Sequence, residues 1–174
     1  MKSDIISTNN IMRTITLSII FSFLLISQSN AQALKIVDLE KIFMQSYDKV
    51  DTQLSLKGFQ FEGLEDKDDC EILKYVLNKN GQQPEYLYKY KYDNGGVLLT
   101  YSIFDAKAYS VIKQSLTTNG FTYVDQDSYN GTLILKYKKG KVYLSLYSGV
   151  VEPENGVPYN AYEINFMNEV YENQ

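Results

Sequence analysis

Tyrosines occupy alternate positions of the segment EYLYKYKY, residues 85–92. Alternate side chains of a strand point to the same face of its sheet, so this segment would form a ladder of tyrosines. The members of this tyrosine ladder are Tyr86, Tyr88, Tyr90 and Tyr92. A tyrosine ring combines a rigid apolar surface with a hydroxyl group, and it loses little entropy when it becomes fixed. The ladder could therefore bind a protein or a glycan.

A purely structural interpretation competes with binding. Lysine avoids burial, so Lys89 and Lys91 are predicted to face water, which would pack the tyrosine ladder under a helix. We favour this interpretation for the ladder. The second tyrosine-rich segment covers residues 141–147. Its Leu144 and Leu146 are predicted to face the core, which leaves Tyr143 and Tyr147 exposed. The candidate binding residues are Tyr143, Tyr147, Tyr86, Tyr88 and Tyr90.

A second cluster of polar side chains is the acidic segment 62–71. A calcium loop needs oxygen ligands at ordered spacings and a glycine at its sharp turn, and residues 66–71 have neither. Residues 125–131 come closer, but Tyr129 stands where a ligand is needed. We therefore predict no metal site. The acidic segment is interpreted as a solvated loop, with a docking patch for a basic partner as the alternative.

The composition removes most catalytic arrangements. The 174 residues include no histidine, which excludes Ser-His-Asp and Cys-His systems. Cys70 is the one cysteine, so no internal disulfide can form, and we expect it to be buried beside the sheet. No phosphate-binding or dinucleotide-binding glycine motif is present. We predict no catalytic residue, no cofactor and no enzyme activity, although a glycosidase built on two carboxylates stays open.

The tyrosine-rich segments must be positioned by strands joined through short turns. Turn signals stand at Asn130-Gly131, Lys139-Gly140 and the segment 93–96, each between two alternating segments. The strands predicted from them cover residues 85–92, 97–104, 121–124, 133–137, 141–147 and 159–167.

Helical spacing precedes each group of strands. Apolar residues recur every three or four positions from Ile36 to Leu54, which predicts one helix with Asp38 as its N-cap. Gly58 should end this helix in the left-handed conformation, with Phe59 folding back on the last turn. A further helix should begin at Asp105 and end with the same pair at residues 120–121.

A shift of 62 residues aligns several of these features. The aligned pairs are Tyr47 with Tyr109, Leu54 with Leu116, Gly58-Phe59 with Gly120-Phe121, Ile72–Tyr75 with Ile134–Tyr137, and Phe104 with Phe166. This self-similarity predicts an α+β fold made of a tandem repeat, with residues 32–104 and 105–174 as its two copies. Each copy would be a helix followed by about four antiparallel strands. The strands would form one sheet or two adjoining sheets, with the helices packed on one face.

This order of elements resembles, at the level of the fold, exported tandem modules of the beta-lactamase-inhibitor-protein type and the PepSY type. The resemblance spans residues 36–168 and depends on the element order and the two Gly-Phe helix ends. No family motif matches residue by residue, so no functional residue is transferred. The resemblance implies a non-catalytic binder or inhibitor that works outside the cytoplasm.

The N-terminal residues have the pattern of a secretory signal peptide. Arg13 precedes the apolar stretch Ile15–Ile26, and Ser29 and Ala31 stand where a signal peptidase requires small residues. The apolar stretch would span about 18 Å as a helix, which is too short for the ~30 Å hydrocarbon core of a membrane. We predict that residues 1–31 are removed, that the protein is periplasmic or secreted, and that no membrane span remains.

Together these features predict an exported, non-enzymatic binding module. Its partner would be another exported protein, which it would inhibit or neutralise through a tyrosine-rich sheet surface. The alternative is a structural or carbohydrate-binding accessory component of the bacterial cell envelope, with a glycan as the partner. The net charge of −4 argues against nucleic acid.

Overall fold

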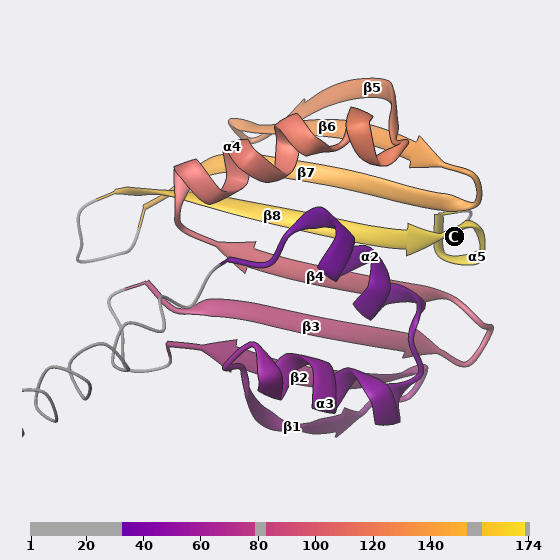
Figure 1. Cartoon of the computed structure of the whole chain (residues 1–174). Helices are drawn as coiled ribbons and strands as arrows, with labels where there is room; N and C mark the ends of the chain where they lie inside the picture. The colour runs from indigo at the N-terminus through magenta and orange to yellow at the C-terminus, as the bar shows by residue number, and fades with distance from the viewer. Residues whose placement is uncertain (1–32, 79–82, 153–157, 173–174) are drawn as a thin grey trace, which may run out of the picture. The chain divides into compact units, whose positions relative to one another are not determined.

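Antiparallel strands dominate the structure, and short helices lie between them (Figure 1). The computed structural model describes residues 33–78, 83–152 and 158–172, and the predicted signal peptide lies outside these residues. The first half contains α2 (Ile36–Met44), α3 (Tyr47–Leu56), β1 (Gln60–Asp66), β2 (Cys70–Leu77), β3 (Glu85–Tyr92) and β4 (Val97–Ile103). The second half contains α4 (Ala106–Ser115), the 3-10 helix η1 (Thr117–Asn119), β5 (Thr122–Tyr129), β6 (Thr132–Lys139), β7 (Val142–Val151), β8 (Tyr159–Asn168) and α5 (Glu169–Glu172).

The strands form one continuous sheet in the order β1-β2-β3-β4-β8-β7-β6-β5. Within each half, strands that follow one another in the sequence pair with one another. The three hairpins expected at residues 93–96, 130–131 and 139–140 are confirmed. The halves meet in the middle of the sheet, where β4 pairs with β8 from Leu98 opposite Met167 to Ile103 opposite Tyr162.

The α+β class is confirmed, but the predicted tandem repeat is wrong. The strands make a single eight-stranded sheet rather than two repeated units, and the first half carries two helices before its strands. Residues that the 62-residue shift aligns also differ in their surroundings. Phe166 is fully buried inside β8, whereas Phe104 follows β4 and is half-buried. Local sequence similarity therefore did not translate into two equivalent modules.

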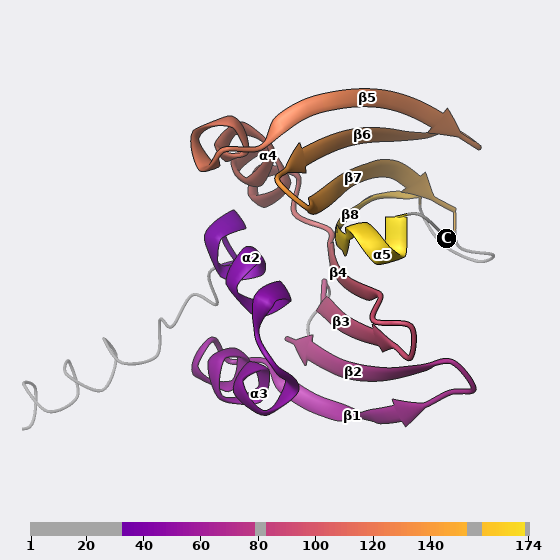
Figure 2. The same ribbon diagram turned by 90° about the vertical axis from the view of Figure 1, so that its right-hand side faces the viewer.

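One face of the sheet carries the hydrophobic core. Helices α2, α3 and α4 all lie against this face, which we call the helix face, as Figure 2 shows. The fully buried sheet residues of the core include Leu87, Leu99, Leu144, Leu146, Ile164 and Phe166. Leu144 and Leu146 thus face the core, as their spacing predicted.

The predicted helix from Ile36 to Leu54 is broken into two. Helix α2 ends at Met44, Gln45 is extended, and α3 begins at Tyr47. The apolar stripe continues across the break because Leu39 in α2 and Val50 in α3 are both fully buried. The start also differs from the prediction, since Lys35 is the N-cap.

Asp38 instead lies in the first turn of α2. The backbone N–H of Lys35 donates to its Oδ2 at 3.2 Å. Two other local predictions are confirmed. Asp105 caps α4 by accepting from the backbone N–H groups of Lys107 and Ala108. Gly58 and Gly120 adopt left-handed φ angles of +86° and +83° where their helices end.

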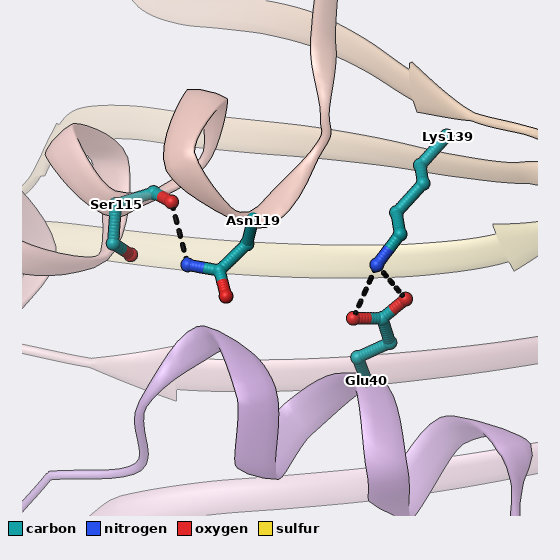
Figure 3. Close-up of polar contacts among 4 residues, drawn as sticks. All are labelled: Glu40, Ser115, Asn119 and Lys139. Atoms are coloured by element: carbon teal, nitrogen blue, oxygen red, sulfur yellow. Dashed lines mark hydrogen bonds and ion pairs between the residues drawn. The ribbon is translucent and has the colours of Figure 1, made fainter.

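A polar contact joins α2 to the second half of the sheet. Lys139 Nζ, at the end of β6, donates to both carboxylate oxygens of Glu40 at 2.6 and 2.9 Å (Figure 3). In the same view, Asn119 Nδ2 donates to the carbonyl of Ser115 at 2.7 Å. The Thr118 hydroxyl also donates to this carbonyl at the end of α4. Helix α2 is thus fixed to strands far from it in the sequence.

The acidic segment 62–71 is largely a β-hairpin rather than the predicted loop. Residues 62–66 belong to β1 and residues 70–71 to β2, with the turn between them. Glu65 forms ion pairs with Lys67 at 3.3 Å and with Lys74. The acidic side chains of the segment are therefore partly neutralised by lysines of the same hairpin.

Candidate functional site

The tyrosine ladder lies on the face opposite α2, α3 and α4, which we call the open face. Strand pairing settles this, because Leu87 and Lys89 alternate with the ladder and are buried on the helix face. The prediction that the ladder packs under a helix is therefore wrong. Lys91 does face water, with 62% of its side chain exposed, but Lys89 is only 2% exposed.

Lys89 is buried because the fold satisfies its ammonium group. Its Nζ donates to the carbonyls of Ile42 at 2.8 Å and Phe43 at 3.1 Å, and also to the carbonyl of Gln45. The carbonyls of Ile42 and Phe43 lie in the last turn of α2, and that of Gln45 lies at its C-cap. Only the Ile42 carbonyl also accepts a local backbone N–H, that of Gln45 at 3.3 Å, so a lysine from the sheet supplies donors at this helix end. Burial lowers the pKa of Lys89 to about 8.

The ladder tyrosines are half-buried and stack in pairs. The rings of Tyr86 and Tyr88 are nearly parallel, with centroids 6.2 Å apart, and those of Tyr90 and Tyr92 are 6.4 Å apart. Tyr171 of α5 packs against Tyr92 at 5.3 Å, and Figure 2 shows α5 on the side away from the other helices. The short helix α5 thus covers the Tyr92 end of the open face and leaves the Tyr86 end uncovered.

A groove of about 480 Å³ occupies that uncovered end. It crosses the junction of the two halves of the sheet and contains residues from β3, β4, β6, β7 and β8. Its lining residues are Tyr86, Tyr88, Ser102, Ile103, Phe104, Thr132, Tyr147, Gly149, Val150, Val151, Tyr159, Ala161, Tyr162 and Glu163. Its size falls within the range of small-ligand pockets, and its walls are mainly aromatic and aliphatic.

The groove brings together three of the five predicted binding residues, Tyr86, Tyr88 and Tyr147. Tyr143 and Tyr90 do not line it. Tyr143 is half-buried on the same face, where Lys138 Nζ donates to its hydroxyl at 2.7 Å and lies 4.4 Å from its ring centroid.

Sequence reasoning missed Phe104, Tyr159 and Glu163. Alternation in the last strand could have placed Tyr159 and Glu163 on one face. Only the pairing of β4 with β8 shows that this face meets the tyrosine ladder.

A row of buried polar side chains crosses the open face beside the groove. Thr100 in β4, Asn165 in β8 and Ser145 in β7 are cross-strand neighbours and are each at most 9% exposed. Asn165 Nδ2 donates to Glu163 Oε1 at 2.8 Å, which holds the carboxylate in the groove. The buried Oδ1 of the same amide has no hydrogen-bond partner among the described residues.

The hydroxyls of Tyr88 and Tyr147 stay neutral at physiological pH. Burial raises the pKa of Tyr147 above its usual value of 10, and the nearby Glu163 carboxylate raises it further. Burial likewise raises the pKa of Tyr88, and the nearby Tyr86 and Glu62 raise it further. These hydroxyls can therefore donate as well as accept hydrogen bonds.

The remaining predictions concern Cys70, metal binding and membrane spans. Cys70 is buried, as expected. In residues 33–78, 83–152 and 158–172, no three His, Cys, Asp or Glu side chains are grouped so that they could hold a metal ion. No helix within these ranges is long and apolar enough to cross a membrane.

The comparisons with known proteins give no relative for this chain. No family model, no curated protein and no solved structure matches it. The resemblance to inhibitor-type and PepSY-type modules therefore stays a prediction, and function has to be argued from the open face itself.

Proposed function

We propose that the protein is an exported, non-enzymatic binding module that holds a partner protein on the open face of its sheet. The observation that carries the proposal is the meeting of Tyr86, Tyr88 and Tyr147 in one groove that no described helix covers. Half-buried tyrosines of this kind offer fixed apolar surface and polar hydroxyls, a combination enriched at protein interfaces. Export rests on the predicted signal peptide, and inhibition of an exported partner is the sharpest form of the proposal.

The double variant Tyr88→Ala/Tyr147→Ala should lose the partner. Both rings line the groove, so their removal deletes its aromatic walls, and we expect affinity to fall at least about tenfold. The protein would be expressed from its full sequence with a C-terminal tag and used to capture proteins from envelope and secreted fractions. A partner identified by mass spectrometry would then be purified and titrated calorimetrically.

Tyr123→Ala is the matched control. Tyr123 is 51% exposed on the edge strand β5 and does not line the groove, so this variant should bind like the wild type. Equal affinity of all three proteins would show that binding does not use the open face. A polysaccharide that binds the wild type but not the double variant, with no protein captured, would favour the cell-envelope alternative.

A further inference from the structure

Glu163 places a carboxylate among aromatic rings without a cation beside it. Among the described residues that line the groove, Glu163 alone carries a charge. Its hydrogen-bond partner among the described residues is neutral, the Asn165 amide at 2.8 Å. No lysine of the described ranges lies within ion-pair distance of its carboxylate.

Five carboxylates elsewhere in the sheet and helices are paired with lysines. The pairs are Asp38–Lys57, Glu40–Lys139, Glu65–Lys67, Glu65–Lys74, Glu71–Lys91 and Glu169–Lys141. Glu163 has no such lysine in the described part of the chain, and it is held in place by a buried amide rather than left to move freely in water. A carboxylate fixed in this way complements a positive charge that the described chain does not supply.

The aromatic walls suit the same kind of ligand. A cation is attracted to the face of an aromatic ring, and an aliphatic stem gains from apolar contact beside it. The open face already shows the first of these contacts, since Lys138 Nζ lies 4.4 Å from the ring centroid of Tyr143. The groove offers Tyr88 and Tyr147 as walls, and Phe104 and Tyr159 meet at one end with ring centroids 5.4 Å apart.

We infer that the groove receives a lysine or arginine side chain of the partner protein, with its charged end paired to Glu163 and its stem against Tyr88 and Tyr147. This inference rests on the proposed function and names the chemistry that the partner must present. The acidic net charge of −4 would also favour approach of a basic surface.

The test uses short peptides in which one central residue varies. The peptides acetyl-Gly-Ser-Xaa-Ser-Gly-amide, with Xaa as lysine, arginine, norleucine or glutamate, would be titrated into the ¹⁵N-labelled protein and followed by NMR. The lysine and arginine peptides should change the amide chemical shifts around residues 88, 147 and 163 in a saturable way. Their dissociation constants should be about 1 mM. Norleucine should bind about tenfold more weakly, and glutamate should give no saturable shift.

Glu163→Gln should reduce lysine binding to the norleucine level, because the amide keeps the shape of the side chain and removes its charge. Glu71→Gln is the matched control. It removes the same charge from an exposed carboxylate outside the groove and should leave peptide affinity unchanged. Norleucine affinity should be the same in all three proteins.

The outcomes separate this inference from the proposed function. Equal affinity for lysine and norleucine peptides, unchanged by Glu163→Gln, would overturn the cation site. The proposed function would still stand if Tyr88→Ala/Tyr147→Ala abolished partner binding. The cation site would also be overturned if neither the lysine nor the arginine peptide gave a saturable chemical-shift change. Tighter binding of butylammonium than of the lysine peptide would overturn a protein source for the cation.

Discussion

Lys89→Met should lower the free energy of unfolding by about 2–4 kcal/mol at pH 7. Methionine fills a similar volume but cannot donate to the carbonyls of Ile42, Phe43 and Gln45. The carbonyls of Phe43 and Gln45 would lose their lysine donor, and that of Ile42 would keep only the 3.3 Å bond from the Gln45 backbone N–H. Helix α2 would then be held less firmly against the sheet, and the break before α3 would lose the side chain that stabilises it.

The size of this effect should depend on pH in a defined direction. The pKa of Lys89 falls from 10.5 to about 8 on folding, so between these values the unfolded chain holds a proton that the folded chain has released. The stability of the wild type therefore rises with pH in this window, by up to about 3 kcal/mol. Lys89→Met lacks this gain, and its deficit should grow from pH 8 to pH 10.5.

Buried tyrosines lower the stability of the protein as the pH rises further. Burial raises the pKa of Tyr75 and of Tyr92 to about 12, so the folded chain keeps protons that the unfolded chain loses above pH 10. The stability of both proteins falls there, and this contribution cancels when the variant is compared with the wild type.

Urea unfolding followed by far-UV circular dichroism between pH 7 and pH 10 would measure the difference. Lys91→Met is the control, because Lys91 lies on the same strand with an exposed side chain and a 3.7 Å ion pair to Glu71. It should change stability by less than about 0.5 kcal/mol. A deficit of Lys89→Met that stayed constant with pH would contradict the assigned titration.

The parts of the fold that were predicted correctly depend on local chemistry. Asn130 and Gly131 both have positive φ angles, 49° and 79°, which is what a tight hairpin requires and what Asn-Gly provides. Asp105 and Gly120 are similarly local signals for the start and end of a helical segment. Such residues fix the conformation of their own few neighbours, so one sequence is enough to recognise them.

The parts that could not be predicted depend on distant contacts. Nothing near β4 in the sequence indicates that it pairs with β8, and this pairing decides both the single sheet and the groove. Alternation placed Tyr88 and Lys89 on opposite faces but did not show which face the helices cover. The general preference of lysine for water gave the wrong answer, because carbonyls from α2, more than 40 positions away in the sequence, satisfy its ammonium group.

Phe166→Ala should be the most damaging single core change among those considered, with a loss of about 3–5 kcal/mol in the free energy of unfolding. Phe166 is fully buried at the centre of the sheet on its helix face. Its ring lies 5.8 Å from that of Phe43 in α2 and 5.9 Å from that of Phe121, measured between centroids. One ring therefore joins packing contributed by both halves of the chain.

The control is Phe61→Ala. Phe61 is 51% exposed on the edge strand β1, so this substitution should cost less than about 1 kcal/mol.

Thermal unfolding would be followed both by far-UV circular dichroism and by tyrosine fluorescence, which the absence of tryptophan makes informative. Because the β4–β8 pair and Phe166 link the two halves, both probes should report one shared transition in the wild type. Two separate transitions would contradict a single cooperative sheet. Because Phe166 points away from the groove, Phe166→Ala should also keep wild-type peptide affinity at temperatures where it is folded.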